Sequence, residues 1–211
     1  MIENSPELSI PALRAGDRHQ FALLVDSYSI PIYRLGLKML GNQQDAEDVL
    51  QITFLKALQH LGDFEGRSSL STWLYRIAAN EALMLLRRNS QKSIRQSISL
   101  DEESEDADGE ALQPVQLADW TALPESDLLS AESKQHLDSA VQNLPARLRV
   151  VFIMRDIEGL SIKDTAEALA LTETAVKTRL LRARLNLREQ LSDYFGERLH
   201  QETHDEPRTQ P

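Results

Sequence analysis

The sequence predicts an all-α fold of two small helical domains joined by an acidic flexible linker. Aromatic residues make up 5% of the 211 residues, and Gly and Pro number 8 each, which favours helices over a β-sandwich. Apolar residues recur every three or four positions in residues 1–90 and again in residues 132–195, as in helices with one buried face. Between them, residues 91–131 include the run DEESEDADGE, too charged to bury enough apolar surface to fold. The polar tail, residues 196–211, is expected to be disordered.

Composition also limits the chemistry that the chain can perform. There is no cysteine, which excludes disulfides and thiolate metal sites, and the five histidines lack metal-ligand spacing. We therefore expect no metal and no cofactor. The N-terminus lacks the basic start and long apolar core of a signal peptide, and no apolar run is long enough to cross a membrane. These features predict a cytoplasmic protein without membrane insertion.

The first domain is predicted to contain three main helices. Residues 17–40 carry an apolar stripe, and Pro31 is expected to kink or interrupt this helix unless it starts a second one. Gly41 then ends the helix, and Asn42 with Asp45 has the pattern of a capping box for the next.

The second and third helices follow directly. The second, residues 45–61, is expected to bury Ala46, Val49, Leu50, Phe54 and Leu58. A polar loop follows, and the third helix begins at Ser69 or Ser71 and runs to Arg87-Arg88.

The second domain begins near Glu132 with a helix that is lined by Leu137, Val141 and Leu144. Pro145 starts the next helix, which Gly159 ends. Ser161 with Asp164 is another capping-box pattern and opens a short helix. The residues Ala170-Leu171-Thr172 break that helix, and a basic helix follows.

The last two helices predict a helix-turn-helix, because small Ala166 allows a close crossing and the intervening turn is short. The second of them carries Lys177, Arg179, Arg182, Arg184 and Arg188. The chain has net charge -10, but residues 91–136 hold 11 acidic and 3 basic side chains, so both domains are close to neutral. A cationic helix in this setting indicates binding to DNA phosphates and bases.

Two longer motifs resemble a known family. The segments DAEDVLQITFLKAL and FEGRSSLSTWLYRIAANEALMLLRR are similar to region two of the sigma-70 superfamily, in the extracytoplasmic function (ECF) subfamily. The segment LPARLRVVFIMRDIEGLSIKDTAEALALTETAVKTRLLRARLNLREQL is similar to region four. The matches cover about residues 18–90 and 134–192 in the family's order. The resemblance implies an alternative sigma factor, not an enzyme, for a specific regulon that responds to stress or the envelope.

The resemblance also implies roles for individual residues. Contact with the clamp coiled coil of core RNA polymerase falls on Asp45, Asp48, Gln51 and Phe54. Recognition and melting of the minus-10 element fall on Arg67, Ser68, Trp73, Tyr75, Arg76, Asn80, Arg87 and Arg88. Recognition of the minus-35 element falls on Thr174, Lys177, Thr178, Arg179, Arg182 and Arg184. The helix from Leu148 to Met154 is expected to dock on the polymerase flap, and an anti-sigma factor is a further expected partner.

One stretch departs from the family pattern. Many relatives have polar residues after Asn80, whereas this chain has Glu81 and the apolar run from Leu83 to Leu86. Either base recognition differs there, or another protein covers that face.

Two alternatives remain open from the sequence. One is a free-standing helix-turn-helix regulator that binds operators without polymerase, against which the Trp73 and Asp45 helices argue. The other is a hydrolase or metal enzyme that uses Asp45, Glu47, Asp48 or His60. No nucleophile elbow, phosphate loop or histidine pair favours it.

Overall fold

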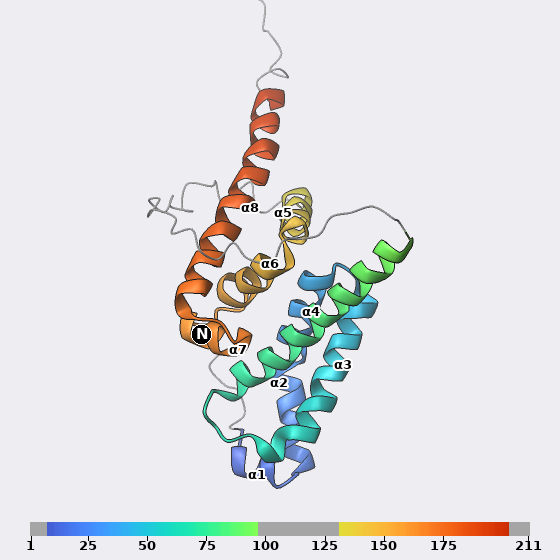
Figure 1. Ribbon diagram of the computed structural model, residues 1–211, viewed down its shortest axis with the longest axis vertical. Coiled ribbons are helices and arrows are strands. Elements are labelled where there is room, and N and C mark those ends of the chain that lie inside the picture. Colours follow the sequence, from blue (N-terminus) through green and yellow to red (C-terminus); the bar gives the residue numbers. More distant parts are fainter. Residues whose placement is uncertain (1–7, 97–130, 203–211) are drawn as a thin grey trace, which may run out of the picture.

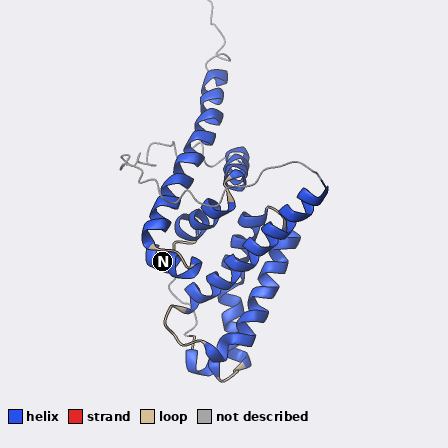
Figure 2. Ribbon diagram, in the orientation of Figure 1, coloured by secondary structure: helices blue, strands red, loops and turns tan. Residues whose placement is uncertain are grey.

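The computed structural model describes residues 8–96 and 131–202, and within these ranges it contains helices and no strand (Figures 1 and 2). The first region contains α1 (Ile10–Arg14), α2 (Arg18–Leu40), α3 (Gln43–His60), a 3₁₀ turn (Leu61–Asp63) and α4 (Leu70–Gln96). The second region contains α5 (Ala131–Asn143), α6 (Ala146–Phe152), a π-helical turn (Ile153–Ile157), α7 (Ile162–Leu169) and α8 (Glu173–Glu202). The all-α prediction is confirmed.

The first region is a bundle of α2, α3 and α4. Helices α2 and α3 approach closely where Gly36 lies against Ala46, since a Cβ on Gly36 would come within 3.2 Å of the Ala46 Cα. Its core consists of fully buried apolar side chains: Leu24, Ile32, Leu35, Met39, Val49, Ala57, Leu74, Ala78 and Ala82. The interior is therefore packed with aliphatic groups from all three helices.

The ends of the helices follow the predicted caps. Gly41 takes the left-handed conformation at φ 77° after α2, and the Asn42 carboxamide oxygen accepts from the Asp45 amide at 2.8 Å to begin α3. Ser69 accepts from the Thr72 amide at 3.1 Å at the start of α4. The predicted helix caps are therefore confirmed. Each cap satisfies a backbone group that the helix itself leaves unpaired.

The prediction that Pro31 interrupts the helix or starts a second one is wrong. Helix α2 runs through Pro31 without interruption, so no second helix begins there. Proline removes one backbone hydrogen bond at that turn. Buried Leu24 and Ile32, on either side of Pro31, hold the helix in register through packing.

The prediction that α3 buries Leu58 is wrong. Its side chain is 55% exposed, while neighbouring Ala57 is fully buried and takes the inward position. Leu50 and Phe54 are half-buried rather than buried. The apolar stripe of α3 is narrower than its count of apolar residues suggests.

The second region ends in the helix-turn-helix that the sequence predicts. The Ser161 hydroxyl accepts from the Asp164 amide at 3.0 Å, and Ala170 turns the chain after α7 with φ 54°. Ala166, Val176 and Leu180 are buried where α7 meets α8. The sequence did not predict the π-helical turn between α6 and α7.

The predicted tail is partly helical. Helix α8 continues to Glu202, so residues 196–202 are helical rather than disordered, which corrects the expectation. The predicted linker, residues 91–131, is too long at both ends, because α4 continues to Gln96 and α5 begins at Ala131. Residues 97–130 of the linker and residues 203–211 of the tail lie outside the described residues.

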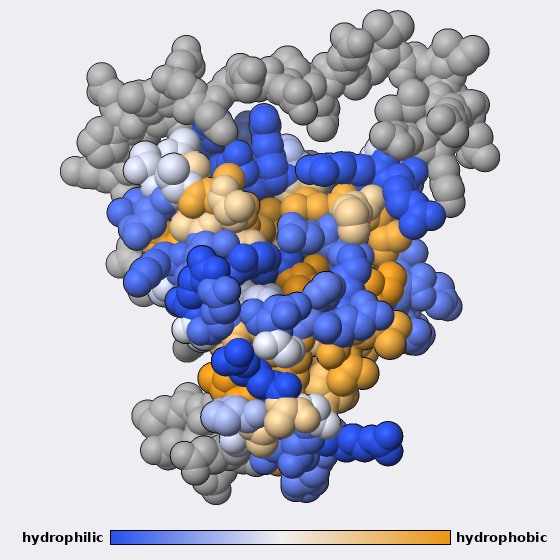
Figure 3. Space-filling view, turned by 60° about the horizontal axis from the view of Figure 1, so that its bottom comes forward, coloured by the Kyte–Doolittle hydropathy of each residue, from blue (hydrophilic) through white to orange (hydrophobic). Residues whose placement is uncertain are grey.

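The two regions pack against each other. Helix α7 lies beside α4, and α5 lies near the C-terminal end of α2 (Figure 1). Buried residues of both regions belong to one continuous apolar cluster. The space-filling view that brings the α1 end forward shows hydrophobic areas among hydrophilic ones on the surface (Figure 3).

We predict that Leu35→Ala lowers the free energy of unfolding by about 2–5 kcal/mol, since Leu35 is fully buried and its truncation leaves a cavity. Urea unfolding followed by circular dichroism measures this. Ile30→Ala on the same helix is the control, because Ile30 is 71% exposed and its truncation should cost about 0.5 kcal/mol or less. Equal losses for the two variants would contradict the packing.

Candidate nucleic-acid interfaces

The first turns of α8 present a polar surface. Thr174 and Lys177 are exposed, and Thr178 and Arg182 are half-buried on the same side of the helix. The Thr172 hydroxyl caps α8 by accepting from the Ala175 amide at 3.1 Å. The opposite face is buried in the domain through Val176, Leu180, Ala183 and Leu187. This arrangement leaves the N-terminal part of α8 able to enter a DNA groove.

The other two predicted arginines of α8, Arg179 and Arg184, are half-buried like Arg182. Arg184 Nε and Nη2 donate to the Asp156 carboxylate at 2.9 and 2.8 Å. This bidentate pair raises the pKa of the Arg184 guanidinium. Arg179 is half-buried. Arg184 therefore contributes to the structure of the region by linking α8 to the π-helical turn.

One face of α4 gathers most of the residues that are predicted for the minus-10 element. Trp73, Arg76, Asn80 and Arg87 follow each other at spacings of three, four and seven, which places them on one side of a helix. Asn80, Arg87 and neighbouring Arg88 are exposed. The face therefore combines an aromatic ring, an amide and cations.

Glu81 points away from this face. It is buried, and its carboxylate accepts from Lys56 Nζ at 2.5 Å, which links α4 to α3. The departure from the family pattern at position 81 is thus a contact inside the first region. Met84, in contrast, is exposed beside Asn80 and Arg88.

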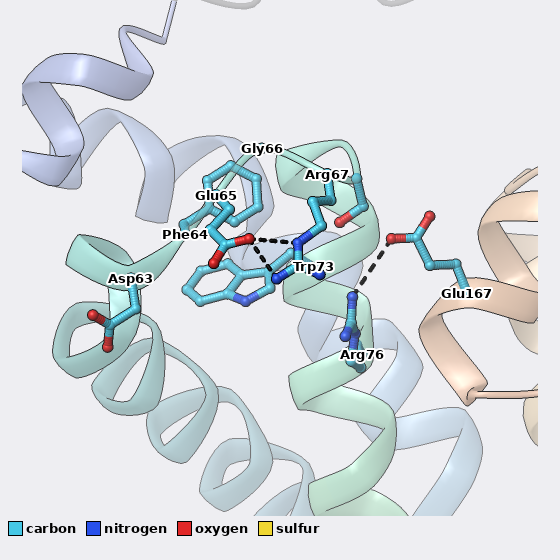
Figure 4. A pocket seen from close by; sticks show the side chains of 9 residues that line it. Asp63, Phe64, Glu65, Gly66, Arg67, Trp73, Arg76 and Glu167 are labelled. Atoms are coloured by element: carbon cyan, nitrogen blue, oxygen red, sulfur yellow. Dashed lines mark hydrogen bonds and ion pairs between the residues drawn. The ribbon is translucent and has the colours of Figure 1, made fainter.

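A pocket of about 370 Å³ opens at the N-terminal end of this face (Figure 4). Its wall includes Phe64 and Trp73, whose ring centroids are 5.3 Å apart. Arg67 and Ser68 from the preceding loop also line it, and Arg67 is paired with Glu65 at the exposed rim. A pocket of this size with an aromatic wall and polar groups can accept a flat, small ligand.

Tyr75 lies elsewhere, which differs from the expectation that it belongs to the same surface. Its side chain is buried, and its hydroxyl donates to Glu158 of the second region at 2.9 Å. Burial is the main reason why the pKa of Tyr75 is raised, and the Glu158 carboxylate adds to it. Tyr75 is therefore inaccessible to DNA in this arrangement.

The outer face of α3 contains the residues that are predicted for polymerase. Gln51 is exposed, and Asp48 is half-buried beside it. Asp45 accepts from Asn42 and Asn89, and Phe54 packs edge-on against Phe21 with ring centroids 6.4 Å apart. Asp45 and Phe54 therefore also hold the first region together.

Sequence reasoning missed part of this face. Leu55 is 58% exposed, and with Leu58 it continues the outward side of α3 from Glu47 and Gln51. Apolar residues in an amphipathic helix are assigned to the core by default, so only their spacing from Gln51 could have revealed them. Exposed leucines next to acids are suited to a partner with a mixed apolar and basic surface.

The described residues contain no group of three or more metal-binding side chains. Within the same ranges, no helix is both long and apolar enough to cross a membrane.

Comparison with known families identifies the class of protein. Residues 24–92 match the family model for Sigma-70 region 2, and residues 134–187 match that for Sigma-70, region 4. The chain is thus a sigma-70-type transcription initiation factor and not an enzyme. Neither the free-standing regulator nor the hydrolase remains as an alternative.

Curated relatives narrow the class further. The ECF RNA polymerase sigma factor SigW of Bacillus subtilis is 34% identical over 87% of this chain and 95% of its own length. The ECF RNA polymerase sigma-E factor of Haemophilus influenzae is also 34% identical, over 83% of this chain and 89% of its own. This chain belongs to the ECF subfamily of sigma-70 factors.

Solved structures share the fold. The sigma factor RpoE in complex with the anti-sigma factor NepR from Bartonella quintana aligns with a TM-score of 0.59 at 24% identity, over 82% of this chain and 96% of RpoE. CnrH in complex with the cytosolic domain of CnrY aligns with a TM-score of 0.61 at 22% identity, over 87% of this chain and 95% of the other.

We predict that the contribution of Tyr75 to stability disappears at alkaline pH. The raised pKa keeps the folded phenol neutral, whereas the unfolded phenol ionises near pH 10, at about its ordinary pKa. The contribution is therefore complete below about pH 10 and is lost as pH rises toward the folded pKa. Urea unfolding at increasing pH measures it.

Tyr75→Phe is the control for this titration. It cannot ionise, so its stability should fall less steeply above about pH 10 than that of the natural chain. Parallel curves for the two proteins would contradict a perturbed Tyr75.

Proposed function

We propose that this alternative sigma factor joins core RNA polymerase through the outer face of α3 and holds a promoter at two points. Asp48, Gln51, Leu55 and Leu58 form the α3 surface, which combines acidic, amide and apolar groups. Such a surface is complementary to a basic and partly apolar coiled coil, the clamp of the polymerase. Asp45 and Phe54 act there mainly by holding α3 in place.

The observation that carries the proposal is the face of α4 with its adjoining pocket. An unstacked base needs an aromatic platform, and the displaced strand needs cations for its phosphates. Trp73 supplies the platform, and Arg76, Arg87 and Arg88 supply the charge. We propose that the pocket, with Arg67 and Ser68 at its edge, receives a base of the minus-10 element as the duplex opens.

The start of α8 is proposed to read the minus-35 element. Thr174, Lys177, Thr178 and Arg182 lie together on its accessible side. Arg179 and Arg184 flank this side, and Arg184 also links α8 to Asp156 of the π-helical turn. The helix from Leu148 to Met154 is mostly buried, so we propose that only its outer edge reaches the polymerase flap.

Two further proposals concern the cellular setting. An anti-sigma factor is a fitting partner, since a structure of the same fold is a complex with such a protein. We propose that the protein acts in the cytoplasm, where transcription takes place, on a regulon that responds to stress or the envelope.

We predict that Trp73→Ala impairs strand opening more than duplex binding. Stacking of one base on an aromatic ring contributes about 1–3 kcal/mol, and only the opened promoter makes this contact. Permanganate footprinting of unpaired thymines in a reconstituted holoenzyme measures opening, and a gel-shift assay measures binding. Trp73→Phe keeps an aromatic ring and should retain most of the opening. Equal losses in both assays would refute the role of the pocket.

We predict that Lys177→Ala weakens binding to the upstream promoter element by about 1–3 kcal/mol if Lys177 contacts a base edge. The loss should vanish on DNA whose contacted base pair is changed. Arg147→Ala provides the control, because Arg147 is an exposed cation of the same region outside the helix-turn-helix. An equal loss for Arg147→Ala would point to general charge rather than recognition.

A further inference from the structure

The apolar run from Leu83 to Leu86 in α4 is explained by packing at every position except one. Leu83, Leu85 and Leu86 are half-buried and pack against the core of the molecule. Met84 is 44% exposed and does not belong to this packed set. Single exposed apolar residues are common on protein surfaces, so the position of Met84 on the helix decides what it indicates.

Met84 lies on the side of α4 that carries the residues proposed for the minus-10 element. An α-helix turns by about 100° per residue, so the eleven residues from Trp73 to Met84 bring the two side chains to within about 20° of the same direction. Asn80 and Arg87, both exposed, lie about 40° and 60° from Met84 on this side. Met84 is therefore near the middle of the α4 face.

The surroundings of Met84 on α4 are cationic. Arg87 and Arg88 follow it by three and four positions and are exposed. The only acidic residue in the sequence of α4 is Glu81, whose buried carboxylate is paired with Lys56 Nζ at 2.5 Å. Helix α4 thus places positive charge next to Met84 and its single negative charge elsewhere. An apolar group between cations fits a groove of DNA, whose edges are phosphates.

The DNA group that suits an exposed apolar side chain is the methyl group of thymine. The other groups that read out base identity in the major groove are hydrogen-bond donors and acceptors, which a methionine cannot satisfy well. Methionine is unbranched and has three rotatable bonds, so its side chain can adjust to the position of a methyl group. The chemistry of Met84 therefore favours an A·T base pair as its neighbour.

We propose that Met84 contacts the methyl group of a promoter thymine close to the base in the pocket, and that this contact makes the factor prefer an A·T pair there. The proposal rests on the proposed function of the α4 face as a DNA-binding surface. At about 1.5 Å per residue, Met84 is about 17 Å from Trp73 along α4, which is the length of about five base pairs. The contacted thymine is thus expected within about five base pairs of the base that stacks on Trp73.

Replacement of single thymines by deoxyuridine tests this contact, because it removes the methyl group alone. The full-length chain with purified bacterial core RNA polymerase first selects promoters from a pool of random duplexes. Each thymine in and beside the minus-10 element is then replaced in turn, and a gel-shift assay measures binding of the holoenzyme. At one position the natural chain should lose affinity about fourfold, as expected for loss of about one buried methyl group.

Variants of Met84 show whether this side chain makes the contact. Met84→Ala should show no loss with deoxyuridine at that position, because the contact is already absent. Met84→Asn should change the base that is selected there and leave the selected minus-35 element unchanged. Ile30→Ala is the matched control, since Ile30 is an apolar residue of α2 that is 71% exposed, and it should respond to deoxyuridine as the natural chain does. Circular dichroism verifies that each variant remains helical.

The possible failures are distinguishable. If the natural chain selects promoters but Met84→Ala and the natural chain respond equally to deoxyuridine at every position, the contact is overturned and the proposed function stands. Weaker binding of Met84→Ala to core polymerase without DNA would also overturn the contact, because Met84 would then face a protein. If the natural chain selects no promoter at all, the proposed function fails and the contact fails with it.

Discussion

Burial of the Glu158 carboxylate imposes a condition on the whole molecule. A charge that is removed from water needs donors within reach, and its donors here are Arg34 and Tyr75 of the other region. Separation of the regions therefore requires that water replace these donors at the same moment. Because Arg34 is 44% exposed, its guanidinium is already partly hydrated, so this exchange costs less than for a fully buried pair. The pair thus links the two regions while one of its partners stays in contact with water.

The residues of α4 have different neighbours because their side chains point in different directions from the helix. One side of the helix carries Trp73, Asn80 and Arg87, and another carries Tyr75 toward the second region. Glu81 points in a third direction, toward Lys56 of α3. A single helix therefore carries the proposed DNA surface, a contact between the two regions and a contact that stabilises the bundle, so the effect of a substitution depends on the side of α4 on which it lies.

The sequence predicted those parts of the structure that local chemistry determines. The caps at Asn42 and Ser161 and the buried face of α8 depend on residues a few positions apart, so spacing is sufficient to find them. The exposure of Leu58, the burial of Tyr75 and the role of Glu158 depend on what lies opposite in space. Partners more than eighty residues away, such as Glu158 for Tyr75, leave no periodic signal in either segment.

The π-helical turn at Ile153–Ile157 has a consequence for how this protein can evolve. A π turn holds one residue more than an α-helical turn, which rotates everything after it by about 100°. Asp156 within this stretch accepts from Arg184, and Glu158 directly after it accepts from Arg34. Deletion of one residue from this turn would rotate Glu158 by about 100° about the helix axis, although Glu158 itself is unchanged. Among related genes, insertions and deletions at this turn, rather than substitutions, are the changes that would most abruptly uncouple one region from the other.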